Sequence, residues 1–365
     1  MFAAAVPIRG RWRDPQRGIM GRLPKDDKPA GAGAGRKVTQ RDIARICGVS
    51  PMAVSMAINH KDGVSKKTAE MIRQAVRKLN YTPNLVAKSL RVSSTKTIGV
   101  IMSDSSPLLF TRFLKVIGDA AEATGYSVVM ANTDQNPERE RSAIDVLMNK
   151  RIDGMIIAAP LLSDDAKIRD VVDFGIPLVM AMRSSRFPVD SVSTDNFAGA
   201  YAMVDYLAKS GSRDIYMINL PRRSQGGALR LKGYADALRA NGLSADLRTV
   251  QHVAPQIADG RVAMEKLLDR GVHGGAVFCG CDLIAIGAME VILGRGLRIP
   301  RDIRVGGFDD IDMLSHLAVP LTTMRQPIER IARMCFDLLL QRLETPSREA
   351  VCLKLPGELI VRKST

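Results

Sequence analysis

The pattern of apolar and polar positions divides the chain into two parts. Between residues 38 and 79, apolar residues recur every three or four positions, which is the spacing of helices that bury one face. From residue 97 onward, short runs rich in β-branched residues alternate with longer stretches of helical periodicity. The first part predicts a small helical unit, and the second predicts an α/β unit built on parallel strands.

The helical unit opens with two short helices joined by a tight turn, in the sequence VTQRDIARICGVSPMAVSMAIN that starts at Val38. Thr39 is the expected N-cap of the first helix, with Asp42 in the capping-box position. Gly48 follows this helix, where a positive φ is often needed, and Ser50 followed by proline is a typical helix start.

Apolar residues give each of these helices an expected inner face. Ile43, Ala44 and Ile46 are predicted to face inward from the first helix, and Val54 and Ile58 from the second. Two helices joined in this way form either a plain helical hairpin or a DNA-binding helix-turn-helix.

A third helix and a short conditional helix follow in the sequence. The segment KKTAEMIRQAVRKLN, after a cap at Ser65, has a helical apolar stripe and is expected to complete a three-helix unit. YTPN then ends that helix. Asn84 to Leu90 predicts a helix barely two turns long, which is marginal alone in water. This segment is therefore a candidate hinge that folds on binding.

The distribution of charge favours the DNA-binding alternative. The 365 residues carry a net charge of +15. Residues 1–96 hold 20 Lys and Arg against 6 Asp and Glu, whereas the rest of the chain holds 33 against 32. A polycationic end on a neutral body indicates a polyanionic partner. Residues 1–37, predicted to be a disordered basic leader, explain part of the excess.

The second part of the chain predicts two similar α/β halves on either side of Asp195. Runs such as TIGVIM, DGMIIAA, GGAVFCG and IRVGGFD are the expected strands, and a closing strand is expected near residues 350–355. Ligands in such sheets bind at the carboxyl ends of the strands, and two halves would enclose a cleft. The helices are expected near residues 107–124, 137–150, 163–174, 197–210, 224–241, 257–270, 282–295 and 328–343.

Other function classes find little support in the sequence. Five cysteines at irregular spacing argue against a disulfide framework, and Cys279 with Cys281 is only a weak metal signal. There is no apolar run of about 18 residues to span a membrane, and the opening residues do not have the order of a signal peptide. With four histidines and no nucleophile elbow, Walker motif or HExxH pair, a sugar-handling enzyme is disfavoured. We expect a cytoplasmic protein without a metal or cofactor.

Taken together, the motifs resemble the lactose/galactose-repressor (LacI/GalR) family of bacterial transcription regulators. The resemblance covers residues 38–365 and rests on the two-helix stretch, LNYTPNLVAKSL, FCGCDLIAIGAM, VGGFDDIDM and LTTMRQP, in this order. It implies a sequence-specific DNA-binding regulator, expected to be a repressor, that is controlled by a small effector such as a sugar or sugar derivative. A periplasmic binding protein, the other candidate, does not explain the basic N-terminal part.

The resemblance also implies the fold. An N-terminal all-α helix-turn-helix head and a hinge helix would precede a C-terminal α/β core of two periplasmic-binding-protein-like subdomains with parallel sheets. Two heads of a homodimer would read a near-palindromic operator. Because no heptad helix follows the last expected strand, we expect a dimer rather than a tetramer. The expected segments are a leader (1–37), a DNA-binding domain (38–82), a hinge and linker (83–96), and an effector-binding and dimerisation domain (97–365), with crossings between subdomains near Thr194, Arg298 and Gln326.

The DNA-contacting positions of the family fall on the two-helix stretch. By resemblance, Pro51, Met52 and Met56 meet base edges in the major groove. The family often has a polar or basic residue at the position of Met56, whereas a thioether can only pack, for example on a thymine methyl group. Met56 is alternatively an ordinary packing residue of the helix. The positions that would contact phosphates, and so fix the register, are Thr39, Ser50, Ser55 and Asn59.

Two residues of the expected hinge helix also match the family. Leu90 matches the leucine that wedges into the minor groove at the centre of the operator, which bends the duplex. Ala87 is small where two hinge helices would approach each other. Leu90 is alternatively a buried linker residue.

Three residues are implied for the effector cleft. Asp282 matches an aspartate that bonds the effector, although it also opens a helix and could serve as its N-cap. Arg230 matches an arginine that grips the effector. Asp195 lies at the end of a strand near a crossing. For all three, the alternative is a capping or surface residue.

The cleft also departs from the family pattern. An acidic residue common near Met182 and the aromatic residues common near Leu108 and Leu109 are missing. Several arginines fall near the same cleft, and arginine suits carboxylate and phosphate groups. We therefore hypothesise an anionic effector, such as a sugar acid or sugar phosphate; the alternative is that these arginines are solvated. They are Arg183, Arg186, Arg222 and Arg223.

Overall fold

The computed structural model describes residues 38–59, 61–79, 81, 94–103, 107–134, 136–158 and 165–365. Contacts divide the chain into two compact units, Met1–Leu85 and Val86–Thr365. We call the described part of the first unit the head and that of the second unit the body. The predicted leader and the predicted hinge helix, with Ala87 and Leu90, lie outside the described residues.

The described head consists of helices α1 (Gln40–Cys47), α2 (Pro51–Ile58) and α3 (Lys66–Lys78). The Thr39 hydroxyl accepts a hydrogen bond from the Asp42 amide, and the Thr39 amide donates to the Asp42 carboxylate, so the predicted capping box is present. Gly48 is left-handed, with a φ of 62°. The two helices and their turn are therefore specified locally by the sequence.

Apolar side chains of all three helices fill the core of the head. Ile43 and Ala44 of α1, Val54 of α2 and Ile72 of α3 are buried together. The prediction that Ile46 faces inward is wrong, because its side chain is 62% exposed. At 3.6 residues per turn, Ile46 lies about 200° around the helix from Ala44, on the side away from α2 and α3.

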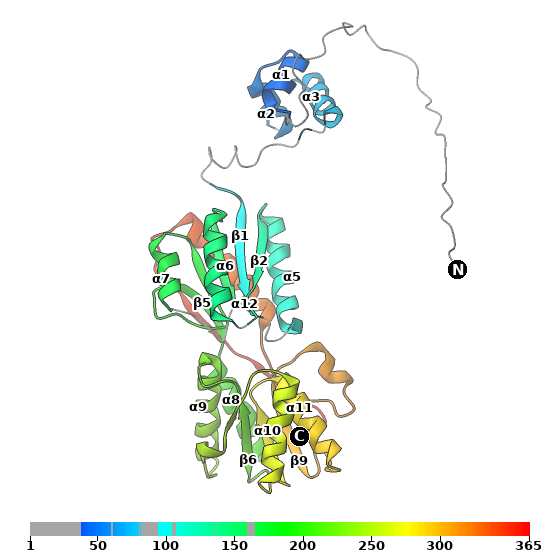
Figure 1. Ribbon diagram of the computed structural model, residues 1–365, viewed down its shortest axis with the longest axis vertical. Coiled ribbons are helices and arrows are strands. Elements are labelled where there is room, and N and C mark those ends of the chain that lie inside the picture. Colours follow the sequence, from blue (N-terminus) through cyan, green and yellow to red (C-terminus); the bar gives the residue numbers. More distant parts are fainter. Residues whose placement is uncertain are drawn as a thin grey trace, which may run out of the picture. The chain divides into compact units, whose positions relative to one another are not determined.

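The body has two lobes, each with one sheet and helices on both of its faces (Figure 1). Lobe 1 has a fully parallel sheet in the order β11-β5-β4-β3-β1-β2. One face packs on α5 and α12, and the other on α6 and α7. The elements are β1 (Thr97–Met102), β2 (Ser127–Asn132), β3 (Gly154–Ala158), β4 (Leu178–Ala181), β5 (Asp190–Thr194), β11 (Cys352–Leu355), α5 (Pro107–Ala123), α6 (Pro137–Asn149), α7 (Asp165–Asp173) and α12 (Ile328–Glu344).

Lobe 2 has the sheet order β12-β10-β9-β8-β6-β7, and only its edge strand β12 is antiparallel. Helices α8 and α9 cover one face, and α10 and α11 cover the other. The fold class predicted from the sequence is confirmed. The elements are β6 (Ile215–Asn219), β7 (Gln251–His252), β8 (Gly275–Cys279), β9 (Ile303–Asp309), β10 (Thr322–Arg325), β12 (Glu358–Ile360), α8 (Asn196–Lys209), α9 (Gln225–Ala240), α10 (Ile257–Asp269) and α11 (Asp282–Gly294).

The chain crosses between the lobes after β5, after β10 and between β11 and β12. The crossings expected near Thr194 and Gln326 therefore lie where the two sheets exchange the chain. The crossing expected near Arg298 is wrong, because Arg298 connects α11 to β9 and both belong to lobe 2. The third crossing is the short link at residues 356–357, which feeds the edge strand β12 that the sequence pattern did not predict.

Close packing of α10 on α11 depends on two glycines. A Cβ atom at Gly260 would lie 2.3 Å from the carbonyl oxygen of Ile284, and one at Gly287 would lie 2.1 Å from that of Ile257. Any larger residue would therefore push the helices apart. The close packing on α10 holds α11 in place, and Asp282 is the first residue of α11.

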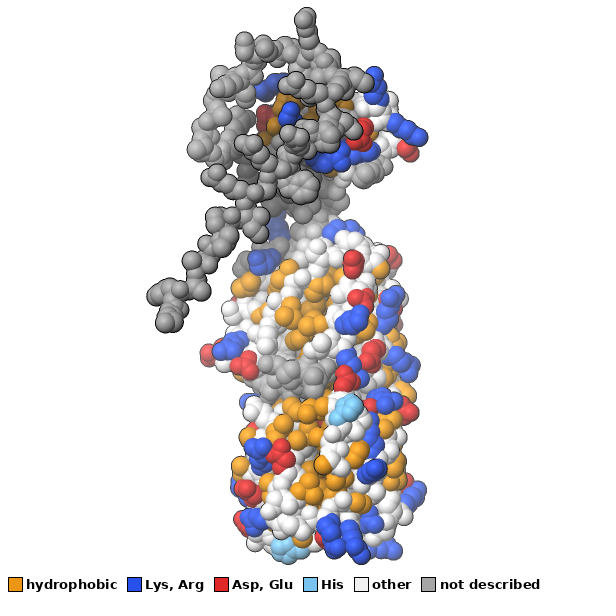
Figure 2. All heavy atoms as spheres, turned by 90° about the vertical axis from the view of Figure 1, so that its right-hand side faces the viewer, with side chains coloured by type: hydrophobic (Ala, Val, Ile, Leu, Met, Phe, Trp, Pro, Cys, Tyr) orange, Lys and Arg blue, Asp and Glu red, His pale blue; other side chains and the backbone are white. Residues whose placement is uncertain are grey.

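One face of the body, turned toward the viewer in Figure 2, carries apolar side chains over both lobes. No helix within the described residues is long and apolar enough to cross a membrane.

Candidate effector cleft and DNA-reading helices

The side chains expected at the DNA are on the outside of the head. Thr39, Ser50, Pro51 and Asn59 are exposed, and Ser55 is half-buried. Thr39 and Ser50 make capping bonds, and the side-chain amide of Asn59 donates to the Ser55 carbonyl at 2.7 Å. Capping therefore fixes the place of the polar groups on both helices.

Met52 and Met56 differ in their surroundings. Met52 is 68% exposed, so its thioether is free to meet another surface. Met56 is half-buried, and its Sδ lies 3.0 Å from the position that a Cβ atom at Gly63 would occupy. Gly63 has a φ of 112°, a conformation that favours glycine. The Met56 side chain therefore lies against the turn that follows α2.

The polar centre of the body lies at the carboxyl ends of the lobe 2 strands. Asp282 follows β8, Asp309 ends β9, and Arg230 comes from α9. All three side chains are buried, with Asp282 fully inaccessible. Charges without solvent need partners in the protein, and the surrounding bonds supply them. We call Asp282, Asp309 and Arg230 the charged floor.

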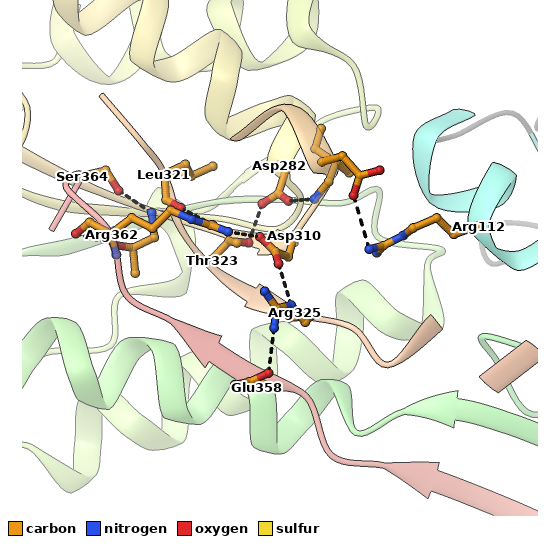
Figure 3. A network of polar contacts seen from close by, with 12 residues as sticks. Arg112, Asp282, Asp310, Leu321, Thr323, Arg325, Glu358, Arg362 and Ser364 are labelled. Carbon is orange, nitrogen blue, oxygen red and sulfur yellow. Dashed lines mark hydrogen bonds and ion pairs between the residues drawn. The ribbon is translucent and has the colours of Figure 1, made fainter. Parts of the chain in front are cut away.

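Asp282 binds the neighbouring strand ends. Its Oδ1 accepts from the Thr323 hydroxyl at 2.6 Å, and its Oδ2 accepts from the Ile311 amide at 3.1 Å (Figure 3). It therefore holds the turn after β9, where Asp309 and Asp310 have φ values of 135° and 59°. Both values are costly for residues other than glycine. The N-cap of α11 is Cys281, which makes no side-chain capping bond, and Asp282 is the first residue of the helix.

Asp310 is held from two sides in the same turn. Its carboxylate accepts from Arg325 at 2.7 Å and from Arg362 at 2.6 Å (Figure 3). The turn is thus fixed by its backbone bonds to Asp282 and by these ion pairs, which explains how two strained residues persist side by side.

Arg230 connects the two sides of lobe 2. Its Nε donates to Asn196 Oδ1 at 2.8 Å, Nη1 donates to the Gly280 carbonyl, and the guanidinium lies 3.7 Å from the centre of the Phe308 ring. Burial lowers the pKa of Arg230, and the charge of Asp309 opposes that shift.

The two carboxyl groups of the charged floor titrate together. Burial, followed by the charge of Asp309, raises the pKa of Asp282 to about 7. Burial also raises the pKa of Asp309 to about 6, and Arg230 and the Gln326 amide oppose this shift. Groups this close share their protons as a pair. Near neutral pH the floor therefore gains or loses a proton easily.

Gln326 joins the charged floor to the connections between the lobes. Its Nε2 donates to Asp309 Oδ1 at 2.5 Å, and its Oε1 accepts from the Thr194 hydroxyl at 2.6 Å. Thr194 and Gln326 lie on two different crossings, so one side chain ties both to the floor. From the sequence, Gln326 was expected only at a crossing, and Asp309 only at the end of the expected strand IRVGGFD. The sequence pointed to these two residues only through the family motifs that contain them, VGGFDD and LTTMRQP.

Two polar contacts also bridge the lobes away from the floor. The Ser184 amide, beyond β4, donates to Gln225 Oε1 at 2.8 Å, and Gln225 Nε2 donates to Ser184 Oγ at 3.0 Å. Arg112 of α5 pairs with Asp312 of lobe 2 at 3.5 Å (Figure 3). A surface ion pair such as that of Arg112 with Asp312 contributes little to stability.

Asp195 lies outside the charged floor. It is half-buried and caps α8, accepting from the Ala198 amide at 3.0 Å. The structure therefore joins Arg230 and Asp282 through Asp309, and assigns Asp195 a capping role at the crossing.

The arginines considered for an anionic effector fall into two groups. Arg183 is 9% exposed and directly follows Met182, whose φ is 66°. Arg186, Arg222 and Arg223 are exposed. Only Arg183 among the four has the burial expected of a residue in a ligand site.

No group of three or more His, Cys, Asp or Glu side chains within the described residues is placed to hold a metal ion. Cys279 and Cys281 are buried free thiols, and burial raises both of their pKa values.

Comparison with known families places both units. Residues 95–358 match the periplasmic binding proteins and sugar binding domain of the LacI family, and residues 39–84 match bacterial regulatory proteins of the lacI family. The chain belongs to the LacI family. It is therefore a DNA-binding transcription regulator and not an enzyme.

Relatives and solved structures agree with this assignment. The transcriptional repressor PurR of Pasteurella multocida is 31% identical over 89% of this chain and 98% of its own length. A lac repressor dimer bound to operator and the anti-inducer ONPF has a TM-score of 0.82 at 29% identity, covering 90% of this chain and 99% of that one. A sugar-binding LacI-family regulator from Escherichia coli, complexed with phosphate, has a TM-score of 0.66 at 26% identity, covering 74% of this chain and 99% of that one.

The raised pKa values predict a pH-dependent stability. The folded protein keeps protons on Asp282 and Asp309 that the unfolded chain loses above about pH 4. Their contribution to the free energy of unfolding therefore falls as pH rises from about 4 to about 7. Asp282→Asn removes part of this dependence. In urea unfolding, the stability of the wild type relative to Asp282→Asn should fall between pH 5 and pH 8.

A matched control is Asp302→Asn. Its bonds to Arg298 lower the pKa of Asp302 to about 2, so it is ionised in both states over this range. Its stability difference from the wild type should not change with pH. An equally constant difference for Asp282→Asn would contradict the assigned titration.

Proposed function

We propose that this LacI-family regulator is an effector-controlled repressor whose small ligand, sugar-like or sugar-derived, is bound over the charged floor between the lobes. The observation that carries the proposal is the bonding of Gln326, which ties the floor to two of the three crossings. A ligand that reorganises the bonds of Arg230, Asp282 or Asp309 changes what the crossings contact. The lobes can then respond to binding.

The response can be no larger than the difference in ligand affinity between the two lobe arrangements. The bonds of Ser184 to Gln225 and of Arg112 to Asp312 belong to the arrangement described here. A ligand that needs another spacing of the lobes would break them at low cost. We propose that such a change alters how two heads of a homodimer are presented to a near-palindromic operator.

The apolar face of the body supports the proposed homodimer, because a large apolar surface favours association. A regulator that binds chromosomal DNA works at the nucleoid, in the bacterial cytoplasm.

For the head, we propose that Thr39, Ser50, Ser55 and Asn59 contact phosphates, and that Pro51 and Met52 face the bases. Met56 then supports α2 from behind and does not read a base.

We also propose an anionic effector, such as a sugar phosphate or sugar acid. Arg183 of lobe 1 and Arg230 of lobe 2 are both buried guanidinium groups, and the acidic residue expected near Met182 is missing. Guanidinium groups bind phosphate and carboxylate in bidentate fashion. A negative ligand would also compensate the desolvation of Arg230.

Calorimetry with the full chain tests the effector class. Ribose 5-phosphate, glucose 6-phosphate and gluconate should include a binder, and ribose and glucose should bind more weakly. Arg183→Gln should weaken the binding by at least about tenfold, since a hydrogen bond between charged groups contributes about 1.5–3 kcal/mol. The exposed Arg222→Gln is the control and should bind as the wild type does. Binding of the neutral sugars alone would reject an anionic effector.

Selection from a random duplex library tests the DNA reading. The full chain should enrich a near-palindrome, and Met52→Ala should lose one symmetric pair of base preferences. The lost apolar contact should cost about 1–2 kcal/mol of binding free energy. Met71→Ala, which removes a 43% exposed thioether from α3, is the control. Unchanged preferences in Met52→Ala would contradict the proposed role, and no enriched sequence at all would contradict the regulator function.

A further inference from the structure

A single carboxylate holds the segment by which the chain enters the body. Asp153 Oδ1 accepts from the Thr95 amide at 2.6 Å and from the Thr95 hydroxyl at 2.9 Å. Its Oδ2 accepts from the Lys96 amide at 3.0 Å and from the Ser94 hydroxyl. Three consecutive residues therefore converge on one side chain.

The same segment is fixed by its neighbours in the sheet. The Lys96 carbonyl accepts from the Ser127 amide at 2.8 Å, and the Lys96 ammonium lies 4.2 Å from the centre of the Tyr126 ring. The Asp153 amide donates to the Thr97 carbonyl at 2.8 Å. The first residues of β1, β2 and β3 thus enclose the segment, with Asp153 at its centre.

The backbone at this place is strained. Lys96 has a φ of 50°, and Arg151, two residues before Asp153, has a φ of 55°. Left-handed conformations are unfavourable for such residues and persist only where the surroundings enforce them. The bonds to Asp153 do so, because bonds to an ionised acceptor are stronger than neutral ones.

The bonds to Asp153 lie where the chain from the head enters the body, so they can affect more than local stability. The covalent path from the head to the body enters lobe 1 at Ser94. Along the covalent chain, a displacement of lobe 1 is passed toward the head through this point. Without the bonds to Asp153, residues 94–96 would no longer be fixed to lobe 1, and the chain would leave the lobe in no set direction.

We propose that Asp153 is a positioning residue for DNA binding, which fixes the point and direction at which the head is attached to lobe 1. The proposal rests on the proposed regulator function and adds the residue that transmits it. An attachment that is not fixed in place and direction lowers the effective concentration of the second head of a dimer once the first is bound. Asp153 therefore sets the affinity for a two-half-site operator, and not the affinity of one head for DNA.

Asp153→Ala in the full chain tests the proposal against a duplex that the wild type selects from the random library. Its affinity should fall clearly more than its affinity for non-specific DNA does, because the attachment of the second head loses both its fixed point and its fixed direction. The affinity for poly(dI-dC), which needs no fixed spacing of heads, should stay within about twofold of the wild type. Hydrogen exchange should quicken at the amides of Thr95 and Lys96.

A second variant leaves Asp153 unchanged, so that the test does not depend on the stability of lobe 1 in Asp153→Ala. The double change Ser94→Ala and Thr95→Val removes the two hydroxyl donors, and it should lower the affinity for the selected duplex less than Asp153→Ala does. The control is Asp145→Ala, a 55% exposed carboxylate of the same lobe that pairs with Lys167 and not with the entering segment. It should bind both DNA probes as the wild type does.

Wild-type affinity for the selected duplex in both variants, with faster exchange at Thr95 and Lys96, would overturn the proposal. Unchanged exchange in Asp153→Ala would overturn the anchor itself. A wild type that selects no duplex would instead overturn the proposed function, while exchange would still decide whether Asp153 holds the segment.

Discussion

Burial of three charges at the carboxyl edge of the lobe 2 sheet is the constraint on which the cleft depends. Arg230, Asp282 and Asp309 have almost no access to water. Such groups are tolerated only when the protein replaces the lost solvent with bonds. The strained turn at Asp309 and Asp310 supplies part of this replacement, since its backbone amides point at Asp282. The bonds to Asp282 and Asp310 therefore offset the strain of this turn, and the turn supplies bonds to the buried Asp282.

Because these buried groups depend on each other's charge, a ligand bound next to the charged floor would change their bonding. An anionic group near Arg230 would change the balance of charge that holds Asp309, and Asp309 is bonded to Gln326. Gln326 in turn reaches Thr194 on another crossing. For the proposed ligand, the path to the connections between the lobes is thus one charge interaction followed by two hydrogen bonds. On the far side of lobe 1, Asp153 provides a rigid attachment for the chain that leads to the head.

Local rules predicted the elements well and the tertiary contacts poorly. The capping box at Thr39, the turn at Gly48 and the α/β alternation depend on neighbouring residues, so the sequence determined them directly. The third crossing and β12 did not follow, because a three-residue edge strand depends on its partner β10. Ile46 was misplaced because a short helix has few positions from which to judge its inner face.

The candidate site was predicted in part for the same reason. Arg230 and Asp282 were named from the family resemblance, which carries tertiary information that periodicity lacks. Asp309, Gln326 and Asp153 act through partners far away in the sequence, and no spacing rule identifies such partners. For Met56, the resemblance implied a place at the bases, whereas its nearness to Gly63 is a property of the folded turn that no spacing rule predicts.

The most direct test of the central claim is a binding cycle between the cleft and the DNA. The affinity of the full chain for the selected duplex is measured with and without the tightest binder among the sugar phosphates and sugar acids. The affinity for that compound is then measured with and without the duplex. If the two sites are coupled, the compound changes the affinity for the duplex by the same factor by which the duplex changes the affinity for the compound, typically about 5–150-fold. A factor of one in both directions would contradict control of DNA binding by the cleft.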